Sequence, residues 1–233
     1  MKKQLLAILC VFVINGIAIA DDTETRLKAM AAERNRVFKH KGTSGESYYS
    51  ENCSKELVFW QQAANEGQAI AQSLLAGCYV YGKGIAKDET QAVAWLRKAA
   101  EQGDASAQSG LGVMYFMGQG IAKDETQAVS WYLKAAEQGF VNAQYNLGIM
   151  YEYGKGITKD ETQSVSWYRK AAEQGLANAQ NALGVMYANG TGIAKDEAQA
   201  VAWIRKAAEQ GFAPAQEILR QLSRPSKERN ARA

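Results

Sequence analysis

The sequence predicts an all-α fold, an α/α solenoid built from repeated pairs of helices. The first observation is a self-similar stretch: residues 84–103 return at 120–139, 156–175 and 192–211, each time with a period of 36 residues. A period of this length is typical of repeat architectures, in which each unit buries its apolar face against its neighbours. The second observation is that each unit carries the signals of two helices separated by glycines.

The first helix of each unit follows a glycine and is represented by residues 105–117. Ala107 and Leu111 lie four residues apart, which is helical spacing. Gly112 follows them, although a glycine inside a helix costs about 1 kcal/mol relative to alanine. Because the next two units keep this glycine, we expect another helix to pack too closely there for a side chain. Ala76 in the first unit indicates that one methyl group is tolerated.

The second helix of each unit is predicted to begin after Asp124 and to end at Gly139. Asp is a favourable N-cap residue, and Gln127 three residues later is typical of a capping box. Four caps in register explain these acidic residues without metal or acid–base chemistry. The expected buried stripe consists of Ala128, Val129, Trp131 and Ala135, and the residues expected to face water are Lys134, Glu137 and Gln138.

Shorter segments precede the four units, which together occupy residues 68–211. Residues 21–47 contain a short amphipathic pattern followed by a loop, and a helix there would cover the open end of the stack. Residues 48–67 are predicted to be a degenerate half repeat. In it Trp60 corresponds to Trp95, with one residue missing before the closing glycine.

Two segments follow the repeats. Residues 212–223 predict a more polar C-terminal capping helix, with Pro214 in its first turn. Residues 224–233 form a basic tail, for which a flexible, solvated end is expected.

The N-terminus has the pattern of a secretory signal peptide over residues 1–20. Lys2 and Lys3 precede a short apolar run, and a small-x-small motif ends at Ala20, so cleavage is expected between Ala20 and Asp21. The alternative is a membrane anchor, but the run is shorter than the ~20 residues needed to span a bilayer. We therefore expect export to the periplasm or beyond the cell, with no membrane span in the mature chain.

Two cysteines, Cys53 and Cys78, would remain after cleavage. An even number in an exported protein suggests a disulfide. If the helices on either side of Gly67 form an antiparallel hairpin, both cysteines lie far from the turn and their heights differ by about one helical turn. The hypothesis is a Cys53–Cys78 bond that fastens the N-terminal end, and the alternative is two separate buried thiols.

Composition argues against nucleic-acid binding and against catalysis. The formal charge is +3 and falls to +1 without Lys2 and Lys3, so the mature chain has no basic field. The sequence contains no S-x-x-K, G-x-S-x-G or H-E-x-x-H motif, and its one histidine, His40, lies in a glycine-containing loop. We expect no enzyme activity, no metal and no cofactor.

The repeated unit resembles the Sel1-like repeat, a relative of the tetratricopeptide repeat. The resemblance covers the four units and half-units on either side, and it implies a right-handed solenoid from a bacterial family that binds other proteins. The copies lack the regular cysteine pair per repeat of the Helicobacter-type branch. In the second unit the matching residues are Ala107, Leu111, Gly112, Tyr115, Gly118, Gly120, Lys123, Asp124, Ala128, Trp131, Lys134, Ala135, Ala136 and Gly139.

One face of the first helix changes from unit to unit, whereas the rest of the unit barely varies. The variable positions have the spacing i, i+3, i+7, i+10 and i+11, which places them on one helical face. By resemblance to tetratricopeptide repeats, this face lines a concave groove. The alternative is that some of these side chains pack inside the superhelix. The candidate partner-binding residues are Tyr81, Ser106, Ser109, Phe116, Met117, Asn142, Tyr145, Ile149, Glu152, Tyr153, Asn178, Asn181 and Asn189.

The predicted groove is chemically mixed. Its aromatic residues and Met117 are candidate anchors, because such side chains bury a large area with few rotatable bonds. Its asparagines can clamp a peptide backbone through paired amide donors and acceptors. The sequence therefore predicts an exported module that binds a protein or peptide. Family resemblance offers two uses: a periplasmic immunity or envelope adaptor protein, and a secreted factor that binds host proteins.

Overall fold

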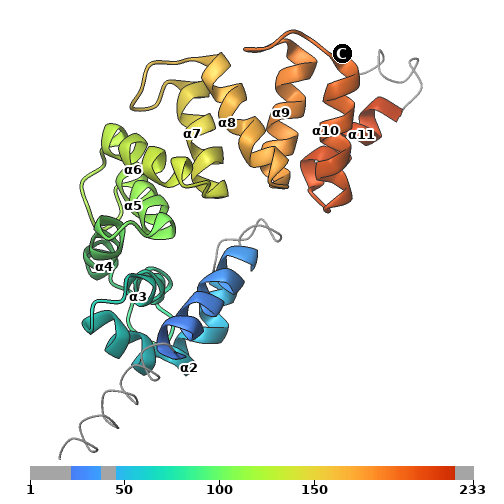
Figure 1. Cartoon of the computed structure of the whole chain (residues 1–233). Helices are drawn as coiled ribbons and strands as arrows, with labels where there is room; N and C mark the ends of the chain where they lie inside the picture. Colours follow the sequence, from blue (N-terminus) through green and yellow to red (C-terminus); the bar gives the residue numbers. More distant parts are fainter. Residues whose placement is uncertain (1–21, 38–45, 224–233) are drawn as a thin grey trace, which may run out of the picture.

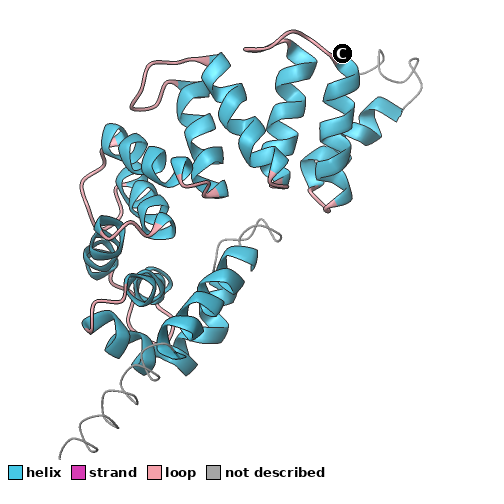
Figure 2. Cartoon of the chain, viewed as in Figure 1, coloured by secondary structure: helices cyan, strands magenta, loops and turns pink. Residues whose placement is uncertain are grey.

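The structure, a computed structural model, describes residues 22–37 and 46–223. Every regular element in these ranges is an α-helix (Figure 2). The predicted signal peptide, its cleavage site at Ala20 and Asp21, His40 and the basic tail lie outside the described residues.

A helix over residues 22–37 is followed by α2, a longer helix of 20 residues, and then by helices joined through short glycine-containing turns. The helices α3 to α10 all have 13 residues. Their bounds are α2 Glu46–Asn65, α3 Ala69–Tyr81, α4 Glu89–Glu101, α5 Ala105–Met117, α6 Glu125–Glu137, α7 Val141–Tyr153, α8 Glu161–Glu173, α9 Ala177–Asn189, α10 Glu197–Glu209 and α11 Ala213–Ser223.

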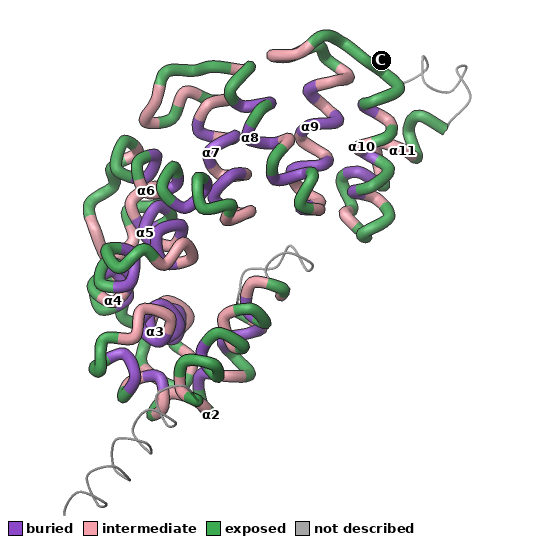
Figure 3. The backbone as a smooth tube through the Cα atoms, viewed as in Figure 1, coloured by how far each residue is buried: buried purple, intermediate pink, exposed green. Residues whose placement is uncertain are grey.

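Successive helix pairs follow one another along an arc (Figure 1). Each helix packs against the next one in the chain, from α2 through to α11. The buried residues, drawn in purple in Figure 3, form a series of small cores between these helices. The predicted all-α solenoid is confirmed, and its single row of cores leaves one long inner face available.

The N-caps of the second helices are confirmed. Asp124 Oδ1 accepts hydrogen bonds from the backbone N–H groups of Thr126 and Gln127, at 3.0 and 2.9 Å. The backbone N–H of Asp124 donates to the carbonyl of Tyr115 at 2.9 Å, which ties the cap to the preceding helix. Asp160 repeats both cap bonds, and Asp88 and Asp196 repeat the bond from the glutamine three residues later; all three also donate to the preceding helix.

Close packing at the glycine inside the first helix is also confirmed. A Cβ on Gly112 would lie 2.7 Å from Cδ1 of Tyr132, a distance that real contacts do not reach. Tyr132 lies on the second helix of the same unit and is buried. In the first unit Ala76 and Leu96 hold the corresponding places in one core, so a smaller partner accompanies the extra methyl group.

The glycine in the link between the helices has a second role. Gly120 has a φ of +66°, in the left-handed region, and a Cβ there would overlap the backbone carbonyl of Glu89. Glu89 begins the second helix of the preceding unit. The link of each unit therefore rests on the start of a helix in the unit before it.

The expectation that Trp131 belongs to the buried stripe is wrong. Trp131 is half-buried, and the fully packed side chain is that of its neighbour Tyr132. The exposed face of the indole is covered by Lys134, whose Nζ lies 4.1 Å from the ring centroid. Lysine three residues after tryptophan repeats this cation–π contact in α4, α8 and α10.

The alignment of Trp60 with Trp95 is wrong for the same reason. Trp60 is completely buried, as are the residues in phase with Leu96, and no residue is missing before Gly67. Phe59 takes the half-buried place of Trp95, and Arg26 covers its ring at 4.1 Å. The half repeat thus keeps the period. Its tryptophan stands one residue later in the unit, at the buried position that Leu96 holds in the first unit.

Glutamines link each repeat to the next, and Gln138, which is exposed as expected, takes part in the link. Gln138 Nε2 donates to Gln108 Oε1 at 2.7 Å, and Gln108 Nε2 donates to the carbonyl of Ala100 at 3.1 Å. We call this pair of bonds, repeated every 36 residues, the glutamine relay. Its members are Gln72 with Gln102, Gln108 with Gln138, Gln144 with Gln174, and Gln180 with Gln210.

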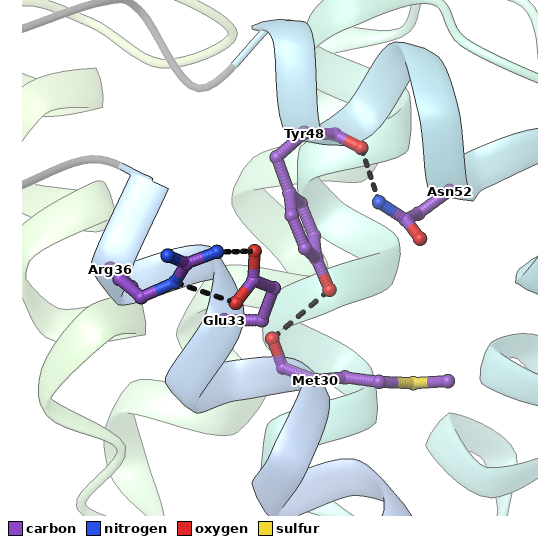
Figure 4. Close-up of polar contacts among 5 residues, drawn as sticks. All are labelled: Met30, Glu33, Arg36, Tyr48 and Asn52. Carbon is purple, nitrogen blue, oxygen red and sulfur yellow. Dashed lines mark hydrogen bonds and ion pairs between the residues drawn. The ribbon is translucent and has the colours of Figure 1, made fainter. Parts of the chain in front are cut away.

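The helix over residues 22–37 covers the N-terminal end of the stack. Leu27 is buried in the first core, and the hydroxyl of Tyr48 in α2 donates to the carbonyl of Met30 at 3.0 Å (Figure 4). Asn52 donates in turn to the carbonyl of Tyr48 at 2.8 Å. This end of the repeat array is therefore closed.

The predicted disulfide is confirmed. Cys53 of α2 and Cys78 of α3 are bonded, with their Cα atoms 5.8 Å apart and both residues fully buried. Cys78 holds the place that Met114, Met150 and Met186 hold in later units, all of them buried. At the N-terminal end the disulfide thus occupies the core position that a methionine side chain fills in the later units.

Candidate functional site

The inner face of the arc contains a groove of about 580 Å³. Residues of α3, α5, α7 and α9 line it, together with one residue of α2, two of α4 and several in the links, so it runs across four successive units. Its charged lining residues, Lys87 and Glu89, form an ion pair at 2.8 Å, and the remaining lining residues are uncharged. The lining residues are Tyr49, Ser73, Gly77, Val80, Tyr81, Lys87, Glu89, Leu96, Ser106, Ser109, Gly110, Val113, Met114, Gln119, Phe140, Asn142, Tyr145, Asn146, Leu176 and Asn178.

Some of the residues that the sequence singles out lie together in this groove, and others do not. The groove is lined by Tyr81, Ser106, Ser109, Asn142, Tyr145 and Asn178. The residues outside its lining are Phe116, Met117, Ile149, Glu152, Tyr153, Asn181 and Asn189.

The residues outside the lining fall into two groups. Phe116 and Ile149 are half-buried. Phe116 packs against the core between α6 and α7, and Ile149 packs against the core between α8 and α9. Met117 and Tyr153, at the ends of α5 and α7, are 58% and 63% exposed. Asn189 is exposed at the end of α9. Phe116 and Ile149 therefore support the fold, and the exposed residues extend the inner face beyond the groove.

Tyr145 joins the groove to a polar cluster in the third unit. Its ring is tilted against that of Tyr168, with centroids 5.6 Å apart, and its hydroxyl is hydrogen-bonded to Asn178. Tyr168 donates to Oε2 of Glu152 at 2.6 Å. Burial, and then the Glu152 carboxylate, raise the pKa values of Tyr145 and Tyr168, so both phenols stay protonated at neutral pH.

The chain itself fills the inner face of the first unit. Arg34, on the helix over residues 22–37, is 1% exposed and donates to Ser73 Oγ at 2.9 Å. The ring of Tyr49 lies against Gly77 so closely that any Cβ there would overlap it. Tyr49 also stacks on Tyr81, with centroids 5.3 Å apart. The open part of the groove therefore begins at Tyr81.

Sequence reasoning missed Arg34 and Tyr49, which lie outside the periodic part of the chain. A signal was present for Tyr49, because Gly77 stands where later units have Val113, Ile149 and Val185. A side chain missing from an otherwise filled position indicates that another side chain occupies the space. Arg34 had no such signal, since arginines are common on exposed helix faces.

The described residues show neither a metal site nor a membrane span. No group of three or more His, Cys, Asp or Glu residues among them could hold a metal ion. No helix in residues 22–37 and 46–223 is long and apolar enough to cross a membrane.

An all-α solenoid with a groove that crosses successive units and has no unpaired charge defines a helical repeat scaffold of the kind that binds proteins. The family model for the Sel1 repeat matches residues 69–104, 105–140, 141–176 and 177–212, one residue later than the period chosen from the sequence. The chain therefore belongs to the Sel1 repeat family, whose members are scaffolds for protein–protein interaction.

Solved structures with the same fold include c5321, a protective antigen present in uropathogenic Escherichia coli strains and displaying an SLR fold. It is 34% identical, with a TM-score of 0.68 over 88% of this chain and 44% of that one, so the chain spans less than half the length of c5321. A Sel1 repeat protein from Oxalobacter formigenes is 31% identical, with a TM-score of 0.67 over 81% of this chain and 73% of that one.

A third similar structure is immunity protein Pa5087 from Pseudomonas aeruginosa. It is 21% identical, with a TM-score of 0.52 over 82% of this chain and 68% of that one, so the likeness shows the fold alone. None of the curated proteins compared with the chain matches it.

Proposed function

We propose that this protein is an exported scaffold that captures a protein or peptide partner in its inner groove, as a periplasmic immunity or envelope adaptor protein. The observation that carries the proposal is the groove itself, whose open part is lined by four successive units and bears no unpaired charge. Such a surface suits an extended or helical segment better than a small ligand, because it continues from one unit to the next.

The groove offers both kinds of contact that a peptide needs. Tyr81, Val113 and Tyr145 present aromatic and aliphatic surface, which supplies most of the energy in protein interfaces. Asn142 and Asn178 add amide groups that can pair with a peptide backbone. The partner therefore needs an apolar segment with free backbone groups.

Export is supported by two features that do not depend on each other. The N-terminal residues have the pattern of a cleavable signal, and the Cys53–Cys78 disulfide suits an oxidising compartment. Mass spectrometry of the protein recovered from the periplasm tests the proposal. A mature chain that begins at Asp21 agrees with it, and an uncleaved chain in the cytoplasm contradicts it.

The second candidate function is that of a secreted factor that binds host proteins. The observation in its favour is the 34% identity to c5321, which is described as a protective antigen. This chain covers 44% of c5321, so the comparison suggests a surface-accessible or secreted setting for the shared repeats and no particular partner. Fractionation of cells and culture fluid distinguishes the two candidates.

The groove is tested by a matched pair of substitutions. Val113 lies in the groove and Leu133 lies on the outer helix α6, and each is 37% exposed. Val113→Asp places a charge in the groove, whereas Leu133→Asp places the same charge outside it. Affinity capture from envelope and culture fractions, read by quantitative mass spectrometry, should show a partner that Val113→Asp loses and Leu133→Asp retains.

Partners lost equally by both variants, or retained by both, would contradict a role for the groove. Circular dichroism and thermal melting of the two variants serve as the folding control. Screening for turnover of general ester, amide and β-lactam substrates tests the expectation that the protein is not an enzyme, and clear activity would overturn it.

A further inference from the structure

The inner face of the first unit shows how this solenoid holds a segment laid against it. Arg34 reaches it from the helix over residues 22–37, and its guanidinium donates to neutral acceptors, Ser73 Oγ at 2.9 Å and Asn35 Oδ1 at 3.2 Å. It is also hydrogen-bonded to the ring hydroxyl of Tyr49. A buried guanidinium needs several acceptors, because it carries five donors and remains charged. Ser73 of the face and Tyr49 of α2 therefore provide acceptors and aromatic surface for an arginine, and Asn35 adds an acceptor from the arginine's own helix.

Positions in phase with Ser73 continue along the same face. They are Ser109, Tyr145 and Asn181, at steps of 36 residues, and each carries an oxygen that can accept a hydrogen bond. Asn181 differs from Ser73 in one respect. Its Oδ1 is buried and has no hydrogen-bond partner among the described residues. An unpaired buried acceptor lowers stability, so the position favours a donor brought by another molecule.

A carboxylate lies on the neighbouring helix of the same face. Glu152 of α7 is half-buried and receives hydrogen bonds from the phenols of Tyr168 and Tyr153. Lys159, which interacts electrostatically with Glu152, is paired with Glu161 at 2.7 Å. Glu152 therefore accepts from neutral phenols, and none of the ion pairs found among the described residues includes it.

These groups are contiguous. Asn178 contacts Tyr145, Tyr145 lies against Tyr168, and Tyr168 is bonded to Glu152. Asn181 is one helical turn beyond Asn178, and Tyr153 follows Glu152 with its ring 63% exposed. We call the set of Tyr145, Glu152, Tyr153, Asn178 and Asn181 the acceptor patch.

Resting on the proposed function, we propose that the acceptor patch binds an arginine side chain of the partner segment, as the first unit binds Arg34. Arginine fits better than lysine for a geometric reason. Its planar guanidinium can stack on the exposed ring of Tyr153 while its donors reach a carboxylate and an amide oxygen. The open part of the groove, which begins at Tyr81 and has no unpaired charge, would then hold the apolar part of the same segment.

A random dodecapeptide library displayed on phage supplies the probe, panned on the full-length mature protein. Four proteins are compared: the wild type, Glu152→Gln, Asn181→Leu and the groove variant Val113→Asp. Glu152→Gln keeps an oxygen for Tyr168 and removes only the charge, and Asn181→Leu removes the unpaired acceptor with little change in volume. Thermal melting confirms that each variant is folded.

We expect the wild type to enrich arginine over lysine at one position of the selected peptides, and Glu152→Gln and Asn181→Leu to lose that enrichment. Replacing that arginine by glutamine in a selected peptide should weaken binding at least tenfold on the wild type and less than threefold on Glu152→Gln, as measured by calorimetry.

Two results overturn the inference, and they are distinguishable from each other. Selected peptides that depend on Val113 but show no arginine, or equal enrichment of lysine, remove the arginine site and leave the proposed groove intact. Absence of any peptide that depends on Val113 removes the groove as a binding site and the arginine site with it.

Discussion

Glycine on one helix and tyrosine on the next fill a single space within the repeats. Gly112 faces Tyr132 and Gly148 faces Tyr168, in both cases too closely for a Cβ. The first unit solves the same packing problem with Ala76 and Leu96, which share one core. The two positions are therefore expected to depend on each other energetically.

The coupling is tested with Gly112→Ala. Although alanine is the better helix former by about 1 kcal/mol, the new methyl group would lie 2.7 Å from the ring of Tyr132, so we expect a net loss of about 1–3 kcal/mol in the free energy of unfolding. Chemical denaturation measures the loss.

The matched control is the double variant Gly112→Ala with Tyr132→Leu, which copies the first unit. Its loss should be smaller than the sum of the two single losses by about 1 kcal/mol. Additive losses would mean that the glycine is required for another reason.

Residue-level reasoning predicted this contact from repetition alone, but it misplaced Trp131, whereas Trp167 in the next unit is buried. Hydrophobicity ranks tryptophan above its neighbour Tyr132, whereas the helix geometry buries Tyr132 and leaves Trp131 at the edge. The methylene stem and ammonium group of Lys134 cover the indole, which makes the edge position stable for tryptophan. A hydrophobic pattern in the sequence does not distinguish a buried position from an edge position that the methylene groups of a neighbouring lysine cover.

Hydrogen bonding between repeats is the main feature at the scale of the elements. In the glutamine relay each buried glutamine near the start of a first helix accepts from a glutamine at the end of the following second helix. It also donates to a helix-terminal carbonyl, as Gln144 does to Ala136 at 3.2 Å. Each buried glutamine thus donates to a carbonyl at the end of one helix and accepts from a glutamine side chain at the end of another.

Gln144→Leu tests the relay in the middle of the array. It removes two hydrogen bonds, one from Gln174 and one to the carbonyl of Ala136, and leaves each of these groups only its bond to Gly139, so we expect the free energy of unfolding to fall by about 1–3 kcal/mol. The control is Gln216→Leu at the exposed C-terminal end, where the glutamine makes one such bond, to Ala208. Equal losses in the two variants would show that the relay contributes nothing beyond a single bond.

The disulfide is a second device at this scale. Replacing both Cys53 and Cys78 by alanine should lower the free energy of unfolding by about 2–4 kcal/mol, because the bond closes a sequence separation of 25 residues. Differential scanning calorimetry with and without reductant measures the effect. Reductant should lower the melting temperature of the wild type and leave that of the double variant unchanged, and a shift in both would point to a different cause.

Elements and their bounds could be predicted almost entirely from sequence, because caps and glycines mark every helix of the repeats. The groove was only partly predictable. The variable face identified Tyr81, Asn142 and Tyr145, but it could not show that Phe116 turns into a core. Nor could it show that a segment outside the period covers Ser73. Packing between helices far apart in sequence decides both.

Buried tyrosines give the whole molecule a characteristic response to alkali. Burial raises the pKa values of Tyr48, Tyr132 and Tyr168 above the usual value of 10.0. The folded state therefore retains protons that the unfolded state loses, and stability should be unaffected below about pH 10 and fall above it.

Urea denaturation at a series of alkaline pH values measures this fall, and the phenolate absorbance shows when the tyrosines ionise. Replacing Tyr132 and Tyr168 by phenylalanine should make the fall less steep. An unchanged slope would assign the alkaline sensitivity to lysines instead of tyrosines.

The two ends of the array differ in how firmly they are held. At one end lie the covering helix, a buried tryptophan and a covalent bond, whereas α11 at the other end buries a single residue, Ala215. A solenoid in which each unit touches only its neighbours opens from its weaker end. Unfolding should therefore begin at α11 and proceed toward the N-terminal end. Limited proteolysis would accordingly yield a ladder of fragments that share their N-terminus and shorten by one repeat at each rung.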